Sequence, residues 1–342
     1  MASVVITGGS GFLGTRLARV LLSMGELRVA GGAVETLGQL TLIDQMPAPA
    51  DLASDPRIGV ITGDLAELVS PGGGGRQALA DADVVFHLAA AVSAECEADF
   101  DLGMRANLHA TQTLLQACRE LGRLPVVVFS SSLAVFGRSD DHPLPAVIDD
   151  ETLPNPQSSY GTQKFMCEQL LADFTRKGFL RGRAVRLLTV SVRPGKPNAA
   201  ASGFFSGIIR EPLAGQHATC PVDPGTEVAL VSPRKAVEAL LCAATSSDDA
   251  WGGRTAVTLP ALTMTVAEMV AALDRVAGPQ TSALIDWVPD PDTDRLVTSW
   301  PARIRADRAT RLGLAPDEDF DSVIRMHISE TGSAPAPVPP RH

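Results

Sequence analysis

The chain has 342 residues, of which 45% are hydrophobic and 20% are charged, and its formal net charge is −10 at pH 7. This length and apolar content predict one large domain with a smaller one attached, and a substantial buried core. The negative charge argues against nucleic acid and anionic membranes as partners, so we expect a small molecule or a second copy of the chain.

Several features of the sequence favour the cytoplasm. No run of about eighteen apolar residues occurs, so no segment is expected to span a membrane. The chain opens directly into a strand-like run at residues 3–7, without the basic region or cleavage site of a secretory signal. The five cysteines are far apart and odd in number, unlike a disulfide framework, and they show no metal-ligand spacing with the histidines. We therefore expect no metal site.

The first half of the chain alternates short apolar runs with helical stretches. The apolar runs predict buried strands of a parallel sheet at residues 3–7, 40–43, 58–62, 83–87, 125–129 and 184–191. Helical spacing is present at residues 12–24, about 98–122 and 159–178, the last with Ser158 or Ser159 as N-cap. This alternation is typical of an α/β fold with a Rossmann-type, doubly wound sheet.

After Pro194 the composition changes. Residues 195–226 are rich in Gly, Pro and Ala and predict loops around a short helix, whereas 227–231 and 235–244 resume strand and helix patterns. We expect a dinucleotide-binding domain over 1–194, to which 227–246 return. A smaller α/β substrate-binding portion is expected over 195–226 and 247–330, with a disordered tail over 331–342.

A glycine-rich turn, Thr7–Gly14, directly follows the first strand and opens the first helix. Gly8 permits a tight turn, Gly11 lets a pyrophosphate approach the backbone, and Gly14 allows close helix–strand packing. The helix N-terminus offers free N–H groups to the phosphates. Such glycines also occur in plain turns, but the strand–turn–helix–strand context favours a dinucleotide site.

Asp44 ends the second strand, where an acidic residue can accept hydrogen bonds from the adenosine ribose hydroxyls. Its charge would repel a 2′-phosphate, so NAD is favoured over NADP. An ordinary aspartate at a strand end is the alternative. Asp64 follows the third strand, where it could meet the adenine amino group. His87, at the end of the fourth strand, is expected to be a core histidine with its hydrogen bonds satisfied.

Tyr160 is the only tyrosine in the chain, and Lys164 follows it by four residues. In a helix the two side chains share a face, and a nearby ammonium favours phenolate and lowers a pKa that is normally near 10. The spacing alone often arises by chance. It gains weight because three serines, 130–132, follow the fifth strand. A serine beside this pair can hydrogen-bond the substrate oxygen that exchanges a proton with the tyrosine.

These motifs, with Arg193-Pro194, together resemble the extended short-chain dehydrogenases/reductases, the NAD-dependent epimerase/dehydratase family, over nearly the whole chain to about residue 330. The resemblance implies that Ser132, Tyr160 and Lys164 are catalytic, that Asn107 supports the active site, and that the protein is a homodimer. The residues implied to bind NAD are Gly8, Gly11, Phe12, Leu13, Gly14, Asp44, Asp64, Leu65, Leu88, Ala89, Ala90, Ser130, Tyr160, Lys164 and Pro194.

Segments 193–205, 299–301 and 309–313 are similar to a subgroup that oxidises the C2 hydroxyl of a four-carbon sugar acid, D-erythronate. Leu133 and Ala134 stand where dehydratases of the family carry an Asp-Glu pair, which argues against dehydration. A nucleotide-sugar epimerase needs the same Ser-Tyr-Lys set and stays open. A non-catalytic dinucleotide sensor is disfavoured because all three catalytic residue types are present.

The expected mechanism is proton removal from a secondary alcohol by the Tyr160 phenolate, while hydride passes to the nicotinamide. Ser132 would fix the substrate oxygen, and Lys164 would hold the ribose. An acid substrate also needs a partner for its carboxylate. Ser93, after the turn at 89–91, and Arg234, after the strand at 227–231, are the candidates. A solvated helix start is the alternative for Arg234.

Overall fold

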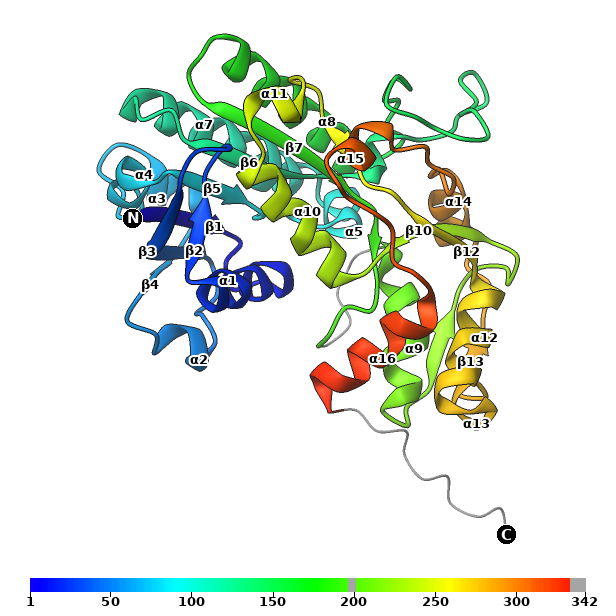
Figure 1. Ribbon diagram of the computed structural model, residues 1–342. Helices are drawn as coiled ribbons and strands as arrows, with labels where there is room; N and C mark the ends of the chain where they lie inside the picture. The colour runs from blue at the N-terminus through cyan, green and yellow to red at the C-terminus, as the bar shows by residue number, and fades with distance from the viewer. Residues whose placement is uncertain (196–200, 333–342) are drawn as a thin grey trace.

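The computed structural model describes residues 1–195 and 201–332 (Figure 1). In that part of the chain, eight strands form a central sheet: β1 (Ala2–Thr7), β2 (Glu26–Arg28), β3 (Val34–Asp44), β4 (Ile58–Thr62), β5 (Val84–His87), β6 (Val126–Ser132), β7 (Arg181–Leu187) and β11 (Val257–Thr258). Their order is β11-β7-β6-β5-β1-β3-β2, with β4 also paired to β3. The pairings are parallel except that of β2 with β3. The predicted α/β class and doubly wound sheet are confirmed.

Helices cover both faces of this sheet, which explains why its strands are continuous apolar runs. The helices that pack on it are α1 (Phe12–Met24), α3 (Leu65–Val69), α4 (Arg76–Asp81), α7 (Ala110–Leu121), α8 (Ser159–Arg176) and α10 (Pro233–Thr245). Along β1, Val4 and Ile6 join the apolar core that includes residues of α1 and α10, whereas Val5 joins the core under α7 and α8. Figure 1 shows α1 and α10 side by side on one face.

The second portion of the molecule has its own core. Its strands form two small sheets, with the order β12-β10-β8 and β13-β9. They are β8 (Thr189–Val190), β9 (Ala218–Cys220), β10 (Glu227–Val231), β12 (Leu262–Thr265) and β13 (Ile285–Trp287). The helices are α9 (Phe204–Leu213), α12 (Val266–Ala277), α13 (Pro279–Ser282), α14 (Pro291–Thr298) and α16 (Phe320–Thr331). Phe205, Leu273 and Phe320 are fully or almost fully buried between them.

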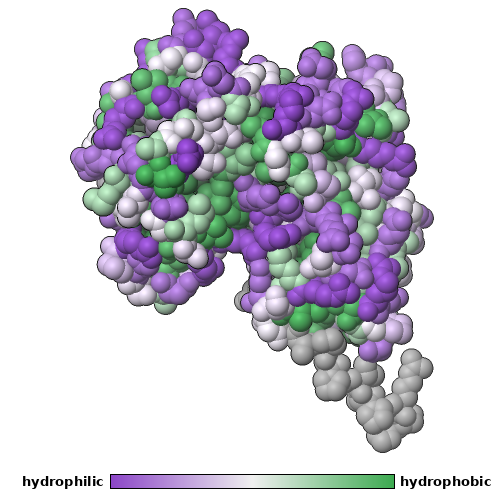
Figure 2. Space-filling model, viewed as in Figure 1, coloured by the Kyte–Doolittle hydropathy of each residue, from purple (hydrophilic) through white to green (hydrophobic). Residues whose placement is uncertain are grey.

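Short helical turns make up the remaining regular structure. They are α2 (Ala50–Ala53), α5 (Ser93–Ala98), α6 (Phe100–Gly103), the π-helical η1 (Met104–His109), the 3₁₀ turns η2 (Leu133–Val135) and η3 (Ala201–Gly203), α11 (Asp248–Trp251) and α15 (Asp307–Arg311). The surface of the molecule is indented between its two portions in the view of Figure 2, and hydrophobic residues gather beside the indentation.

One predicted helix contains an irregular segment, and one predicted strand is broken. The helix expected at about 98–122 is continuous over residues 100–121, as α6, the π-helical η1 and α7, and the Asp99 carboxylate caps its start by accepting a hydrogen bond from the Leu102 N–H. The strand expected at 184–191 breaks at Leu188, so that β7 stays in the central sheet and β8 pairs with β10. The domain boundaries stay predictions. The motif residues at 196–200 and the tail at 333–342 lie outside the described residues.

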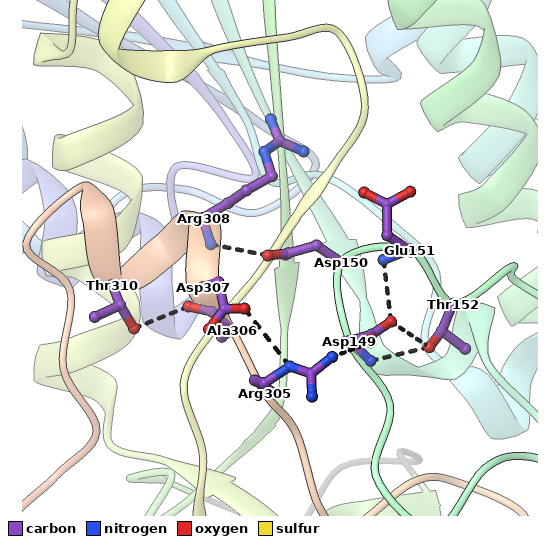
Figure 3. A network of polar contacts seen from close by, with 9 residues as sticks. All are labelled: Asp149, Asp150, Glu151, Thr152, Arg305, Ala306, Asp307, Arg308 and Thr310. Atoms are coloured by element: carbon purple, nitrogen blue, oxygen red, sulfur yellow. Dashed lines mark hydrogen bonds and ion pairs between the residues drawn. The ribbon is translucent and has the colours of Figure 1, made fainter.

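The loop that leads to α8 is tied to a segment about 155 residues later in the chain (Figure 3). Ile148 and Ile304 form a parallel β-bridge. The Asp149 carboxylate accepts a hydrogen bond from Arg305, and the Asp150 carboxylate accepts one from the Arg308 backbone N–H at 2.8 Å. These contacts hold the loop before α8 against residues 304–308.

Candidate active site

The glycine turn after β1 has the shape of a phosphate cradle. Gly8 has a φ of +70°, and a Cβ there would lie 2.7 Å from the Ala89 backbone nitrogen, so a side chain would block this close approach. A Cβ at Gly11 would meet only the Gly8 carbonyl oxygen, at 3.2 Å. No described side chain caps α1, whose N-terminal N–H groups are therefore available to a pyrophosphate. These features fit a dinucleotide.

Asp44 lies at the end of β3 beside this turn. Its carboxylate accepts hydrogen bonds from the backbone N–H groups of Ser10 and Met46, both at 3.0 Å, and these hold it in place. Asp64 has a different local role, since its side chain is exposed and caps α3 by accepting from the Glu67 N–H at 3.1 Å. The Leu65 side chain is packed in the core, which leaves only its backbone for a ligand.

A cavity of about 290 Å³ extends from the glycine turn to the second portion of the molecule. Ser132, Tyr160 and Lys164 are all among its lining residues, as the sequence predicted they would lie together. The Lys164 Nζ donates a hydrogen bond to the Ser130 carbonyl oxygen at 2.8 Å and lies 5.6 Å from the centroid of the Tyr160 ring. Ser158 caps α8 by accepting from the Gly161 N–H at 3.0 Å, which confirms the predicted helix start.

The cavity changes the proton affinities of both side chains. Burial raises the pKa of Tyr160 to about 12, although the Ser132 hydroxyl and the positive charge of Arg193 act in the opposite direction. Burial lowers the pKa of Lys164 to about 8. In the protein alone the Tyr160 pKa is therefore above its usual value. Without NAD, desolvation of the phenolate outweighs the nearby charges, and the lower pKa expected with NAD bound stays a prediction.

The serine run alternates its contacts along β6. Ser130 donates to the His87 carbonyl oxygen at 3.1 Å, and Ser131 donates to Glu168 Oε1 at 2.5 Å. Glu168 is buried and also forms an ion pair with Arg186 at 2.7 Å. Sequence reasoning missed this pair, although Tyr160, Lys164 and Glu168 recur at intervals of four residues. The ion pair joins α8 to β7, and the hydrogen bond from Ser131 joins the same glutamate to β6.

Asn107 and His87 lie behind the cavity. Neither side chain is among the lining residues. Asn107 accepts a hydrogen bond from the Ala91 N–H and donates one to Gln163, both at 2.8 Å, so it positions the turn after β5 and does not reach the reacting atoms. His87 lies between two threonine hydroxyls at 2.7 and 2.8 Å, and burial lowers its pKa to about 3. It is a core histidine, as expected.

The substrate side of the cavity is lined by Ser93, Arg193, Ser202 and Trp300. Ser93, a sequence candidate, accepts a hydrogen bond from the Ala201 N–H at 3.0 Å. Arg234 does not line the cavity, and its side chain is exposed near the start of α10. We correct that expectation, because the residue occupies the solvated helix start that was its alternative.

The comparisons with known proteins agree with this geometry. A family model described as the NAD-dependent epimerase/dehydratase family matches residues 4–257. The chain belongs to this family. It is an enzyme with NAD as its cofactor, as the sequence predicted, and the glycine turn and Asp44 are suited to hold that cofactor.

Two curated members of the family match along nearly their whole length. The chain is 50% identical to D-erythronate dehydrogenase of Cupriavidus necator, covering 97% of this chain and 99% of that protein. It is 40% identical to D-erythronate dehydrogenase of Haemophilus influenzae, covering 95% and 98%. The crystal structure of a nucleoside-diphosphate-sugar epimerase from Agrobacterium tumefaciens has a TM-score of 0.86 and 41% identity, covering 97% of this chain and 95% of that chain.

No helix in residues 1–195 and 201–332 combines the length and the apolar character needed to cross a membrane. In the same residues, no group of three or more His, Cys, Asp or Glu side chains is arranged to hold a metal ion.

Proposed function

We propose that this protein oxidises the C2 hydroxyl of a small sugar acid of the D-erythronate type, with NAD as the oxidant. The observation that carries the proposal is the 50% identity, over almost the full length of both chains, with a D-erythronate dehydrogenase. The cavity supports it with Ser132, Tyr160 and Lys164 among its lining residues. Leu133 and Ala134 are buried beside them, where they supply no acid to protonate a departing hydroxyl.

In the proposed mechanism, Tyr160 as phenolate takes the proton of the C2 hydroxyl. The Ser132 hydroxyl donates a hydrogen bond to the same substrate oxygen and keeps it beside the phenol. The hydride of C2 would go to NAD, which supplies the hydride acceptor when it is bound. Lys164 is assigned to the cofactor ribose, and its ammonium, with the guanidinium of Arg193, stabilises the negative charge on the phenol oxygen.

The remaining cofactor contacts follow from the family and are proposed on the same basis. Gly8, Gly11 and Gly14 accommodate the pyrophosphate, and Asp44 accepts hydrogen bonds from the adenosine ribose, which favours NAD over NADP. The other proposed contacts are with Phe12, Leu13, Asp64, Leu65, Leu88, Ala89, Ala90, Ser130 and Pro194.

A nucleotide-sugar epimerase is the alternative, because the Agrobacterium tumefaciens protein of similar structure carries that name. The two functions differ in their net chemistry, since a dehydrogenase releases NADH and an epimerase keeps its cofactor bound. A non-catalytic dinucleotide sensor is a remote third reading.

The test is NADH formation by the purified protein with NAD and a panel of four- to six-carbon sugar acids and nucleotide sugars. We expect NADH with D-erythronate and no interconversion of nucleotide sugars. Tyr160→Phe, which keeps the ring and removes the proton acceptor, should lose most turnover and keep its NAD affinity. Interconversion of nucleotide sugars without NADH release would move the assignment to the epimerase.

We also propose a homodimer and a cytoplasmic location. The helices that carry Asn107 and Tyr160 are the expected dimer surface by family resemblance, and the neighbouring Phe100 is 61% exposed. All five cysteines are free thiols, which suits a reducing compartment. The dimer is tested by measuring the mass of the protein in solution. Phe100→Glu, which places a charge on this surface, should shift the protein to the monomer.

A further inference from the structure

Arg193 is a cation on the substrate side of the cavity that the sequence-based search for a carboxylate partner passed over. It follows β8, and hydrogen bonds of both its backbone and its guanidinium hold it in place. Its N–H donates to Ser206 Oγ at 3.0 Å, and its carbonyl oxygen accepts from Arg210 at 2.9 Å. The guanidinium donates from Nε to the Val190 carbonyl oxygen at 3.0 Å and from Nη2 to Ser202 Oγ at 3.1 Å. These contacts fix its direction.

The guanidinium of Arg193 has no acidic partner among the described residues. The two arginines that are buried in the described residues are each paired with an acid, Arg186 with Glu168 and Arg183 with Asp248. The Nη1 group of Arg193 donates to none of the described residues. A partly buried charge without a counterion is costly, and an anionic ligand would remove that cost.

The cavity as a whole is suited to an anion. Its described lining contains Lys164 and Arg193 and no aspartate or glutamate, although the protein carries a net charge of −10. Lys164 is directed to the Ser130 carbonyl oxygen. Arg193 is therefore the cation that remains for a substrate.

Arg193 and Tyr160 line the same cavity, and the positive charge of Arg193 favours the Tyr160 phenolate. A substrate group that binds Arg193 therefore lies in the same cavity as the hydroxyl that gives its proton to Tyr160. In a 2-hydroxy acid the carboxylate carbon is bonded directly to the carbon that carries this hydroxyl. The cofactor pyrophosphate, by contrast, is expected at the turn of Gly8, Gly11 and Gly14.

We propose that Arg193 binds the C1 carboxylate of the substrate, with the hydroxyl of Ser202 supporting the guanidinium and that of Ser93 donating to a substrate oxygen. This inference rests on the proposed oxidation of a 2-hydroxy acid and names the residue that selects the acid. The 2-oxo acid product has the same carboxylate, so Arg193 holds the substrate before and after hydride transfer.

The experiment compares D-erythronate with its neutral amide, D-erythronamide, in the unmutated protein and in three variants. Arg193→Met removes the charge at similar length, and Arg193→Lys keeps the charge and loses the planar fork. Arg234→Met is the matched control, because it removes an arginine that lies outside the cavity. The affinity of each variant for NAD, followed by tryptophan fluorescence, reports whether the fold and the cofactor site are intact.

We expect the unmutated protein to prefer the acid, and Arg193→Met to lower kcat/KM for D-erythronate by about 10- to 150-fold, the range for a charged hydrogen bond. KM should rise because the carboxylate contact is lost, kcat should fall because the Tyr160 phenolate loses a nearby positive charge, and the ratio of acid to amide should approach one. Arg193→Lys should be intermediate. Arg234→Met should behave like the unmutated protein, and NAD affinity should stay within about threefold in all variants with an intact fold.

Two results would overturn the role of Arg193 and leave the proposed function standing. One is NADH formation with an unchanged acid-to-amide ratio in Arg193→Met. The other is a ratio near one in the unmutated protein, which needs no variant to fold. Absence of NADH with D-erythronate and every other small 2-hydroxy acid in the unmutated protein would instead refute the function, and Arg193 as carboxylate partner with it.

Discussion

Because Tyr160 is the only tyrosine, the tyrosinate absorbance of this protein reports a single residue without any label. Burial raises its pKa from 10.0 to about 12 in the protein alone. A shift of about two units corresponds to about 2.7 kcal/mol against the phenolate. We predict that rapid pH-jump titration of the folded, NAD-free protein gives a midpoint well above 10, whereas the unfolded chain titrates near 10. In the NAD complex, the added positive charge should bring the pKa well below 10.

The same shift makes stability depend on pH. Between pH 10 and 12 the unfolded chain has lost this proton and the folded chain keeps it, so the free energy of unfolding falls as pH rises through that window. The contribution of the Tyr160 proton to the free energy of unfolding is fully present below pH 10 and is smaller by about 1.4 kcal/mol at pH 11.

Tyr160→Phe has no group to ionise and should lack this loss. The assay is urea unfolding of both proteins at pH 8 and pH 11. The difference between their free energies of unfolding should move by about 1.4 kcal/mol in favour of the phenylalanine variant. An unchanged difference, together with a titration midpoint at or below 10 in the folded protein, would refute the argument that burial dominates this site.

Three further substitutions test other parts of the structure. Burial lowers the pKa of Lys164 from 10.5 to about 8, so the cost of its buried charge is present below pH 8 and shrinks as pH rises toward 10.5. Lys164→Met should therefore raise the free energy of unfolding of the NAD-free protein by about 1–3 kcal/mol at pH 7 and by less at pH 10, and it should weaken NAD binding. An equal change in the free energy of urea unfolding at both pH values would contradict this. Asp44→Ala should lower NAD affinity by about 10- to 150-fold and narrow the preference for NAD over NADP. Equal kcat/KM with both cofactors in the unmutated protein would refute the role of Asp44 in selecting NAD. Glu168→Ala leaves its arginine partner buried and unpaired, so we expect a loss of about 3–5 kcal/mol in the free energy of unfolding. Asp173→Ala, which breaks an exposed pair on the same helix, is the control and should cost less than about 1 kcal/mol.

Local patterns in the sequence were sufficient to predict the central sheet and several helices. The strand runs were recognisable because both faces of the sheet are covered, so that Val4, Val5 and Ile6 are all fully buried. The helix expected at 12–24 has those bounds in the structure. The spacing of Tyr160 and Lys164 predicted a shared helix face, and both residues line the same cavity.

The substrate side could not be predicted in the same way. Arg193, Ser202 and Trp300 come from separate segments of the chain and line one cavity. Near them β8 pairs with β10 outside the central sheet, and residues 303–305 are hydrogen-bonded to Ile148 in the loop before α8. No local spacing encodes such a contact, so the sequence alone does not single out Arg193 as a substrate-side residue. The Tyr160 pKa could not be predicted from the sequence either, because it depends on desolvation by the fold and not only on the neighbouring charge.

The most direct test of the central claim uses D-erythronate that carries deuterium at C2, with NAD and the purified protein. We expect the deuterium to be transferred to the nicotinamide C4 and the product to be the 2-oxo acid. Tyr160→Phe should lose most of this transfer while it still binds NAD. Product formation without deuterium on the cofactor, or oxidation at another carbon, would contradict the claim that C2 is the hydride donor in this site.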